Sequence, residues 1–551
     1  MKPSSPKVLV FALDGWGYKI IKEYIEIYKF PGLQRIVKEG VFGPLSSVIP
    51  YITVPAWPAL LTGKNPGKLG VYTFLERNTN NYALMTVNLK WEHWNTLWNL
   101  LGNYGKKSII INVPTVAAED KEFPGMVISG PIMDKREDVI AYPEALNEEL
   151  LKDNYKIYVS DFEKASPDDF FQEIIEITKK KFEHMVRLFR KEEWDFFMAG
   201  FYYGDVLQHR FWKYLDPSYH LFENNPKYAK IVLEYMQIVD GYIQILFNQI
   251  PQKCHVLVVS DHGMGPCRAK IDLNTWLLKN DYMSLWNEKI HSINLPNIRK
   301  YSLYFKVQNV YKKLIFLPFL RSIRNWFWEK LSKEERSWRD VNWEKTKAYG
   351  GWYSININLK GREPQGIVEP GNEYDNLCEE IILKLINFRD PNTGDLVFKK
   401  IYRKEEIYNG QYLSKMPDLI IEFASESLYF STTRELAPGS KIIDYDTGYN
   451  GAHVRDGILF GYGDSIQKGI SIKNASILDI TPTILHLLDV PIPSDIDGKV
   501  LKEIFNPESS EFKREVHFTE VKESKDIVCE SMVEEEDQRV KDRLRGLGYI
   551  D

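Results

Sequence analysis

Short apolar runs alternate with longer segments of helical periodicity along this chain. Six runs rich in Val, Ile and Phe have the length and composition of buried strands: residues 7–13, 107–113, 195–201, 255–260, 418–423 and 457–461. Helical spacing of apolar residues extends over residues 170–191, 227–249 and 477–488. This alternation predicts an α/β fold, with a doubly wound, mainly parallel sheet and helices on both faces. Ligands of such sheets bind beyond the carboxyl ends of the strands.

Residues 271–414 interrupt this alternation of predicted strands and helices. They contain many aromatic residues and several Pro and Gly turns, and strands and helices alternate less regularly. We therefore expect an α/β core made of residues 1–270 and 415–505, with residues 271–414 inserted as a cap. Residues 506–551 are highly charged and end in EEEDQRVKDRLRGLGYID, which predicts an exposed C-terminal helical tail.

Length, charge and cysteine content argue against several classes of protein. A chain of 551 residues is too long to fold around one simple hydrophobic core, so we expect two or more domains or a core with a large insertion. The 71 basic and 76 acidic side chains leave a net charge of -5, without the basic excess of a protein that binds nucleic acid duplexes. The four cysteines are scattered, so neither a disulfide framework nor a cysteine zinc site is indicated. Because the first apolar run also leads straight into a motif and not into a signal peptide, we expect a cytoplasmic location.

The aromatic residues of the insertion allow two interpretations. Residues 312–331 are strongly apolar, but their uninterrupted apolar part is too short to span a membrane. They either form a buried cap helix, which we favour, or make a peripheral membrane contact through Phe316, Phe319, Trp326 and Trp328. Four further aromatic residues are Trp343, Tyr349, Trp352 and Tyr353. These either pack the cap, which we favour, or stack on a nucleobase or a lipid.

Side chains that could bind a metal ion lie where predicted strands end. Asp261 and His262 come directly after residues 255–260, and Asp14 comes at the end of the first strand. Taken alone, an Asp-His or Asp-Gly pair is a common feature of hydrogen-bonded turns. Carboxylate and imidazole together, however, suit a metal ion such as zinc, whereas magnesium prefers oxygen ligands alone.

Three other segments contain further Asp, His and Thr residues that could belong to the same site. Asp205 and His209 follow the predicted strand 195–201 with i, i+4 spacing, which places both on one face of a helix. His453 lies in a Gly-rich loop just before residues 457–461, so three of the ten histidines belong to this set. Thr53 precedes Pro55 and a helix-like run. Its hydroxyl either lies near a helix N-terminus that faces an anion or serves as an ordinary N-cap.

The order of these residues resembles the alkaline phosphatase superfamily and, within it, the type I phosphodiesterase and nucleotide pyrophosphatase family. The segments TGKNPGKLGVYTF and ILDITPTILHLLDVPIPSDIDGK are similar to that family as well. The resemblance implies two divalent metal ions, zinc in the first place and manganese as the alternative. It assigns one ion to Asp14, Asp261 and His262, with Thr53 reaching it. It assigns the other ion to Asp205, His209 and His453.

The resemblance also implies a reaction. We expect a two-metal phosphohydrolase that cleaves a small phosphate ester, preferably a phosphodiester or a nucleotide pyrophosphate, through a phosphothreonine intermediate on Thr53. The family motif Thr-Phe-Pro-Asn ends here in Ala56, and a family His is replaced by Leu69. A phosphomonoester or a phosphonate is therefore an alternative substrate. A non-catalytic protein that binds a membrane surface on a hydrolase scaffold is the alternative of a different class.

Overall fold

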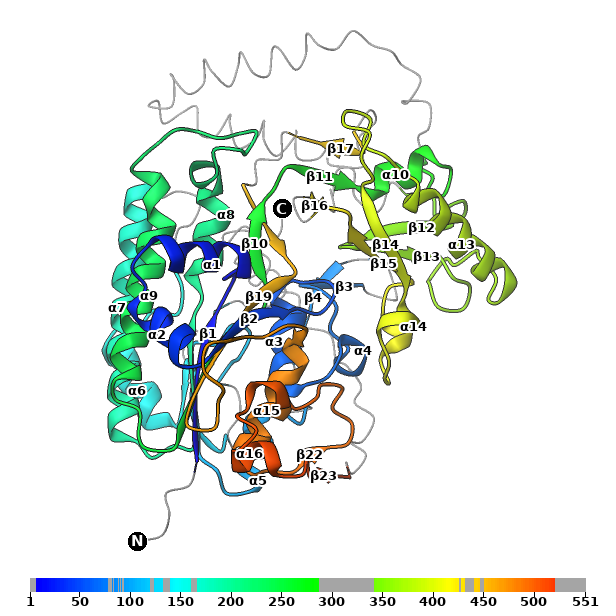
Figure 1. Cartoon of the computed structure of the whole chain (residues 1–551). Coiled ribbons are helices and arrows are strands. Elements are labelled where there is room, and N and C mark those ends of the chain that lie inside the picture. The colour runs from blue at the N-terminus through cyan, green and yellow to red at the C-terminus, as the bar shows by residue number, and fades with distance from the viewer. Residues whose placement is uncertain are drawn as a thin grey trace.

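A ten-stranded sheet forms the centre of the computed structural model (Figure 1). The structure describes residues 6–520 apart from residues 78–81, 83, 88, 90, 92–93, 119–122, 132–138, 160–165, 287–340, 426–427, 432–440 and 446–449. The strands lie in the order β20 (Ile470–Ser471), β2 (Val41–Ser46), β19 (Asp456–Tyr462), β9 (Cys254–Ser260), β1 (Lys7–Leu13), β8 (Phe196–Phe201), β5 (Ser108–Ile111), β6 (Gly125–Ile128) and β7 (Ala141–Tyr142), and β21 (Ala475–Ser476) pairs with β2. All neighbours from β9 to β6 are parallel, while β19 and β7 run antiparallel to their neighbours. The predicted mainly parallel α/β sheet is confirmed.

The central strand β1 sets the level at which the sheet ends. Its sequence KVLVFAL has no polar residue after Lys7, and residues 8–13 are all buried, as expected of a strand covered on both faces. Leu13 pairs with Phe201 of β8 and with Ser260 of β9. Three parallel strands therefore end side by side, and the segments that follow them emerge at one edge of the sheet.

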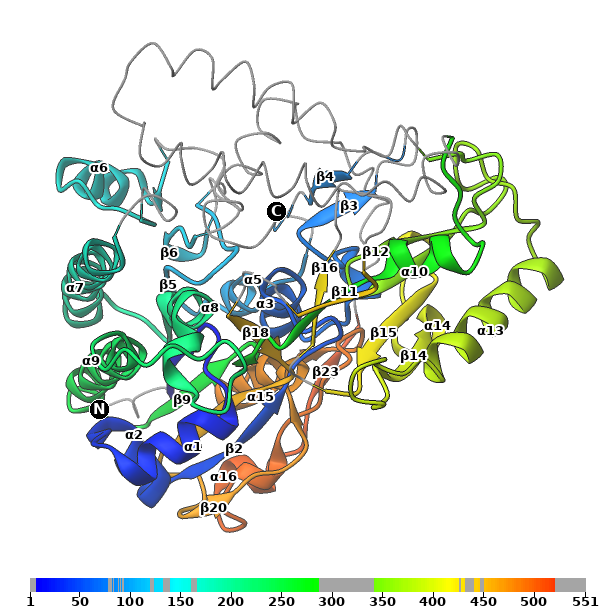
Figure 2. The ribbon, with the colours of Figure 1, turned by 90° about the horizontal axis from the view of Figure 1, so that it is seen from above.

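Helices cover both faces of the large sheet (Figures 1 and 2). On one face α3 (Thr53–Thr62), α5 (Leu97–Asn103) and α15 (Ile480–Leu487) pack together, and on the other lie α1 (Tyr18–Ile27), α2 (Pro31–Glu39), α7 (Pro167–Lys191) and α9 (Ile231–Phe247). The helices predicted at 170–191, 227–249 and 477–488 are confirmed as α7, α9 and α15. A 3-10 turn precedes each of the last two: η2 (Tyr228–Lys230) and η6 (Ile477–Asp479). The structure also describes the helices α4 (Pro66–Leu69), α6 (Glu144–Lys152) and α8 (Tyr203–Leu215).

A second, antiparallel sheet is formed mainly by residues of the expected insertion 271–414 and lies beside the large one (Figure 1). Its strands are, in order, β12 (Ala348–Gly351), β13 (Ser354–Ile357), β15 (Leu419–Phe423) and β14 (Phe398–Arg403), and its helices are α10 (Leu273–Lys279), α13 (Asn372–Ile386) and α14 (Lys404–Ile407). The strand predicted at 418–423 thus exists as β15, but our expectation that it belongs to the core sheet is wrong. An apolar run shows that a strand is buried, not which strand it pairs with. The chain returns to the large sheet at β19.

Smaller pairings complete the fold. The structure describes a ribbon of β10 (Gly263–Pro266) with β18 (Gly451–Val454), and a small sheet of β16 (Leu428–Ser431), β11 (Ala269–Asp272) and β17 (Ile443–Asp444). It also describes the pairs β3 (Leu75–Arg77) with β4 (Leu84–Thr86), and β22 (Ile492–Pro493) with β23 (Phe518–Thr519). The ribbon lies at the carboxyl edge of the large sheet, because β10 begins three residues after β9 ends.

Asp418, just before β15, holds the elements of the second sheet together. Its carboxylate accepts hydrogen bonds from Arg362 at 2.7 and 2.6 Å, from Tyr374 at 3.0 Å, from Lys404 at 3.1 Å and from the backbone N–H of Ile357 at 2.7 Å. Burial alone would raise the pKa of this carboxyl, but the bonded cations outweigh burial and hold the pKa at about 2. A buried charge with this many donors is stable only while all partners are present.

The aromatic residues of the insertion that the structure describes pack inside the protein. Trp343, Tyr349, Trp352 and Tyr353 are all buried. Trp343 stacks on Tyr82 with ring centroids 3.6 Å apart. The favoured packing role is confirmed for these four residues.

The predictions for the apolar segment 312–331 and for the charged C-terminal tail concern residues that lie mainly outside the described part of the chain. Residues 312–331 lie outside the described residues, and so do residues 521–551 of the expected tail. The described part of the tail contains the short helix α16 (Ser510–Lys513) and β23. Among the helices that the structure describes, none combines the length and the apolar character needed to cross a membrane.

Candidate metal centre

Three carboxylates meet at the carboxyl edge of the large sheet. Asp14 directly follows β1, Asp261 directly follows β9, and Asp205 lies in the first turn of α8, which begins just after β8. All three side chains are fully buried. They come together because β8, β1 and β9 are neighbours that end at the same level.

The first group of candidate ligands is Asp14, Asp261 and His262. The Nε2 atom of His262 lies 3.2 Å from Asp261 Oδ2 and 3.6 Å from Asp14 Oδ1. One donor atom from each residue lies within 4.8 Å of the others. The three residues that the sequence assigned to one ion are therefore adjacent in space.

The second group is Asp205, His209 and His453. In α8 the i, i+4 spacing places His209 Nε2 3.4 Å from Asp205 Oδ1. His453 Nε2 lies 3.2 Å from that oxygen and 2.9 Å from His209 Nε2. His262 borders this group, because its ring stacks on that of His453 with centroids 3.9 Å apart. The two groups thus form one continuous cluster.

Backbone carbonyls orient two of the imidazoles. His209 Nδ1 lies 2.9 Å from the Gly451 carbonyl oxygen, and His262 Nδ1 lies 3.2 Å from that of Gly263. A carbonyl only accepts, so each Nδ1 carries the proton and each Nε2 presents its lone pair to the cluster. Both carbonyls belong to the β10–β18 ribbon, which also contains His453. His453 therefore lies in a strand and not in the predicted loop, because its glycine-rich segment pairs with β10.

Thr53 lies beside the first group. It is the first residue of α3, and Ile52 occupies the N-cap position, so the interpretation of Thr53 as an ordinary N-cap is wrong. Its Oγ1 lies 3.1 Å from His262 Nε2. Because the first backbone N–H groups of a helix have no partner within it, an anion at this end would meet both free donors and the positive end of the helix dipole.

The electrostatics of the cluster favour bound cations. Burial raises the pKa of Asp14 well above its ordinary value, and the charges of the other two carboxylates add to this. Burial and the charge of Asp205 raise the pKa of Asp261 in the same way. Burial also opposes the charge on Asp205, but the nearby imidazoles, His209 first among them, leave its pKa below the ordinary value. Because burial lowers the pKa of His262, this ring is ready to bind a metal as a neutral ligand.

The donor atoms fit divalent metal ions. In a tetrahedral zinc site with metal–ligand distances of about 2.0–2.1 Å, neighbouring ligand atoms lie about 3.3 Å apart. The distances of 3.2 and 3.4 Å around Asp205 Oδ1 match this spacing. Asp14 Oδ1 is buried and accepts no hydrogen bond from any described residue, so it has an open position for a cation. Three carboxylates and three imidazoles form a donor set that suits zinc.

Three residues that sequence reasoning missed hold the cluster in place. Gln208 donates from Nε2 to the carbonyl oxygens of Gly15 at 2.8 Å and of Gly204 at 2.9 Å, which ties the segment after β1 to α8. Trp57 donates from Nε1 to Asp14 Oδ2 at 3.2 Å. Gly15 has a φ of 73°, and a Cβ atom there would lie 2.8 Å from Asp205 Cα. Of these three residues, only Trp57 could have been linked to the site from the sequence. Its position four residues after Thr53 places both side chains on the same side of a helix.

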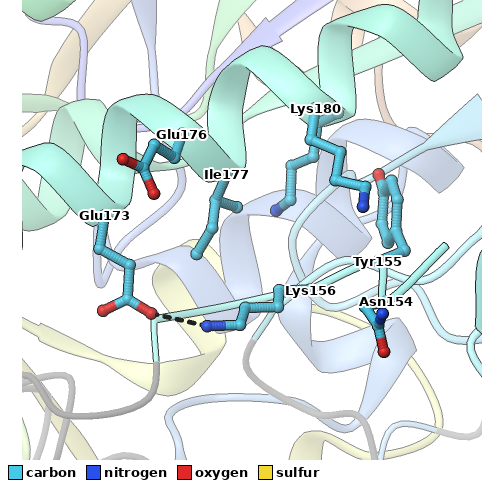
Figure 3. Close-up of a pocket in the computed structure, with 8 residues that line it drawn as sticks. Asn154, Tyr155, Lys156, Glu173, Glu176, Ile177 and Lys180 are labelled. Carbon is cyan, nitrogen blue, oxygen red and sulfur yellow. Dashed lines mark hydrogen bonds and ion pairs between the residues drawn. The ribbon is translucent and has the colours of Figure 1, made fainter.

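A separate cavity lies between α7 and the segment that follows α6 (Figure 3). It has a volume of about 170 Å³, and Tyr155, Lys156, Glu173 and Lys180 are among its lining residues. Lys156 pairs with Glu173 at 3.0 Å, and Lys180 donates to the backbone of Asp153. None of the seven predicted site residues lines it. Its lysines therefore fasten a loop to α7 and do not mark a second charged site.

Comparisons with known proteins give the following similarities. The family described as type I phosphodiesterase / nucleotide pyrophosphatase matches residues 8–452. Human ectonucleotide pyrophosphatase / phosphodiesterase 5 has a solved structure with 15% identity and a TM-score of 0.49, over 91% of this chain and 100% of that chain. The murine protein of the same name has 14% identity and a TM-score of 0.49, over the same shares of the two chains. The curated proteins contain no match.

Proposed function

Because this chain belongs to the type I phosphodiesterase/nucleotide pyrophosphatase family, and is therefore a metal-dependent hydrolase, we propose that it cleaves phosphodiesters or nucleotide pyrophosphates through a phosphothreonine intermediate on Thr53. One observation carries the proposal. The Thr53 hydroxyl lies 3.1 Å from His262 Nε2, inside a buried cluster of carboxylates and imidazoles and at the start of α3.

Two divalent ions complete this proposal. Asp14, Asp261 and His262 would hold one ion beside Thr53, and Asp205, His209 and His453 would hold the other. Zinc is favoured by the donor set, and manganese is the alternative. When bound, such ions lower the pKa of a nucleophile and neutralise the charge that develops on a phosphoryl group.

The Thr53 hydroxyl performs the covalent step. Its Oγ1 attacks phosphorus, the Oγ1–P bond forms as the bond from phosphorus to the leaving oxygen breaks, and the hydroxyl proton is released. The leaving oxygen takes up a proton and departs. Water then attacks the phosphothreonine, the Oγ1–P bond breaks, and Thr53 regains its proton. The start of α3 stabilises the phosphoryl oxygens in both steps, because its dipole and its first N–H groups face them.

Ala56 changes how the phosphate is held. In the family motif an Asn at this position donates to a phosphate oxygen, and Ala56 has no donor. Pro55 also lacks a backbone N–H, so the first turn of α3 offers the N–H groups of Thr53 and Val54. We infer that backbone donors replace the missing side chain. The loss of one donor weakens the distinction between diesters and monoesters, so phosphomonoesters and phosphonates stay alternative substrates.

The substitution Thr53→Ala tests the proposal. Removing a nucleophile commonly lowers kcat by a factor of about 10⁴ or more, so hydrolysis of an aryl phosphodiester in the presence of zinc or manganese should be lost. Metal content, measured by atomic emission on the dialysed protein, should stay at two ions per chain. Full activity of the variant would refute the assignment of Thr53.

A substrate panel settles the alternatives. Phosphodiesters, nucleotide pyrophosphates, phosphomonoesters and phosphonates are assayed with zinc, manganese or magnesium, and the preferred class is the one with the highest kcat/KM. The peripheral membrane contact through residues 312–331 and the cytoplasmic location remain predictions. Sedimentation with anionic liposomes tests the contact, and fractionation of the source cells tests the location.

A further inference from the structure

Trp57 connects the helix of the proposed nucleophile to a proposed metal ligand. It lies four residues after Thr53 in α3, so the two side chains are on the same side of the helix. The ring is fully buried, and its Nε1 donates a hydrogen bond to Asp14 Oδ2 at 3.2 Å. An indole N–H only donates, so the carboxylate is the acceptor.

The two oxygens of Asp14 have different surroundings. Oδ2 accepts from Trp57, whereas Oδ1 lies 3.6 Å from His262 Nε2 and accepts no hydrogen bond from the described part of the chain. The indole therefore fixes the rotation of the carboxylate. It leaves Oδ1, and not Oδ2, directed at the place where His262 and Asp261 also present ligand atoms.

These contacts form a closed ring. Thr53 Oγ1 lies 3.1 Å from His262 Nε2, His262 is adjacent to Asp14, Asp14 bonds to Trp57, and one turn of α3 leads back to Thr53. All four residues are buried. Because a helical turn is rigid, the indole sets the distance between the hydroxyl and the ligand atoms as well as the direction of the carboxylate.

We propose that Trp57 is a positioning residue that orients Asp14 toward the first metal ion and fixes that ion relative to Thr53. This inference rests on the proposed function, because it takes Asp14 as a metal ligand. Removing the hydrogen-bond partner of a metal ligand typically weakens metal binding about 10- to 100-fold. The same loss is expected here for one of the two ions only, since Trp57 bonds to a ligand of the first group.

A metal titration tests the inference without a substrate. Metal-free protein is titrated with Zn²⁺ in competition with a chelating indicator, for the wild type, for Trp57→Phe and for a form with β-(3-benzothienyl)alanine at position 57. That analogue replaces the N–H by sulfur and keeps the ring shape. One of the two binding steps should weaken about 10- to 100-fold, and the other should change less than about threefold.

Trp98→Phe is the matched control. Trp98 lies in α5 and is 2% exposed, and its ring packs against Trp91 and Phe123. The same atoms are therefore removed from a buried ring that has no metal ligand as partner. Its zinc affinities should equal those of the wild type. If Trp57→Phe does not fold, the benzothienyl form carries the test, because the ring shape is retained.

The possible outcomes separate the two proposals. Wild-type affinities in the benzothienyl form, equal weakening of both binding steps, or the same weakening in Trp98→Phe would overturn the role of Trp57 alone. A wild-type protein that binds no zinc and no manganese would overturn the proposed function and this inference together. Selective weakening of one step supports the inference even where the tested substrates are not turned over.

Discussion

At the scale of single residues, the cluster contains charges that burial makes unfavourable. Asp14, Asp205 and Asp261 are fully buried, with Asp14 and Asp261 beside His262 and with Asp205 beside His209 and His453. Isolated ionised carboxylates in such a place would take up protons. Bound divalent ions remove this cost, and the carbonyl contacts at Nδ1 of His209 and His262 already leave both Nε2 atoms unprotonated. The residues are thus arranged for cations before any cation binds.

Metal binding should release protons and weaken as the pH falls. Burial raises the pKa of Asp14 and Asp261, so both carboxyls bind protons above the ordinary carboxyl range near pH 4 in the metal-free protein. A metal ion needs the ionised form and displaces those protons. Titration calorimetry in two buffers of different ionisation enthalpy, at a pH just above the ordinary carboxyl range, should show the release. Equal heats in both buffers would contradict it.

At the scale of elements, the site depends on how closely the segment after β1 approaches α8. Gly15 lies against Asp205, and Gln208 bonds across the same gap to the Gly15 carbonyl oxygen. A residue with a Cβ atom cannot occupy this position without moving α8. The two groups of candidate ligands are therefore joined through backbone contact as well as through His262.

Gly15→Ala should separate the two groups. The new Cβ atom would lie 2.8 Å from Asp205 Cα, at a φ of 73°. We expect the free energy of unfolding to fall by more than about 2 kcal/mol and zinc affinity to fall with it. Gly105→Ala is the control, because its φ is 70° but no atom lies within 4 Å of the new Cβ. That variant should lose only about 1–2 kcal/mol and keep its zinc affinity. Equal effects of the two changes would refute the role of close approach.

Asp418→Asn should destabilise the second sheet. Its carboxylate has four donor residues around it, and breaking a buried ion pair by removing one partner costs about 3–5 kcal/mol. Urea unfolding measures the change. The exposed pair of Asp375 with Arg403 is the control, since Asp375→Asn should change stability little.

The same carboxylate predicts a pH dependence. Its pKa of about 2 in the folded protein is below the ordinary value. Its contribution to stability is therefore complete above about pH 4 and is lost as the pH falls toward 2. The unfolding free energy of the wild type should decrease more steeply over this range than that of Asp418→Asn. Parallel pH profiles would contradict the assignment.

At the scale of the whole molecule, the candidate metal centre joins segments from most of the chain. Its residues follow β1, β8 and β9 or lie in α3, α8 and β18, and they extend from Asp14 to His453. The segment between β11 and β18 returns to the core through the ribbon with β10, which presents His453 to the other ligands. Bound ions would therefore cross-link elements that are far apart in sequence.

Removal of metal should lower the thermal stability of the whole chain. A ligand at a concentration 100 times its Kd stabilises the native state by about 2.7 kcal/mol, and two ions act together. Differential scanning calorimetry should show a lower Tm after treatment with EDTA and recovery when Zn²⁺ is added back. Asp205→Asn should reduce this shift, because it removes a candidate ligand. An unchanged Tm on chelation would contradict a metal-stabilised core.

The sequence alone determined the residue types of the site and the local elements that present them. Continuous apolar runs predicted β1, β8 and β9, because strands covered on both faces need no polar alternation. The spacing of Asp205 and His209 predicted their shared helical face, and the residues after Thr53 predicted the start of α3. These features depend on neighbours within a few positions, so a local pattern is sufficient to reveal them.

Only the tertiary structure decided which distant segments meet. It placed β15 in the second sheet, placed His453 in a strand and put Trp57 against Asp14. These contacts join residues 43 positions apart in the case of Trp57 and Asp14, and 244 in the case of His209 and His453. Hydrophobic burial has no direction and does not specify a partner, so packing of the complete chain selects these pairs and brings the ligand atoms to one place.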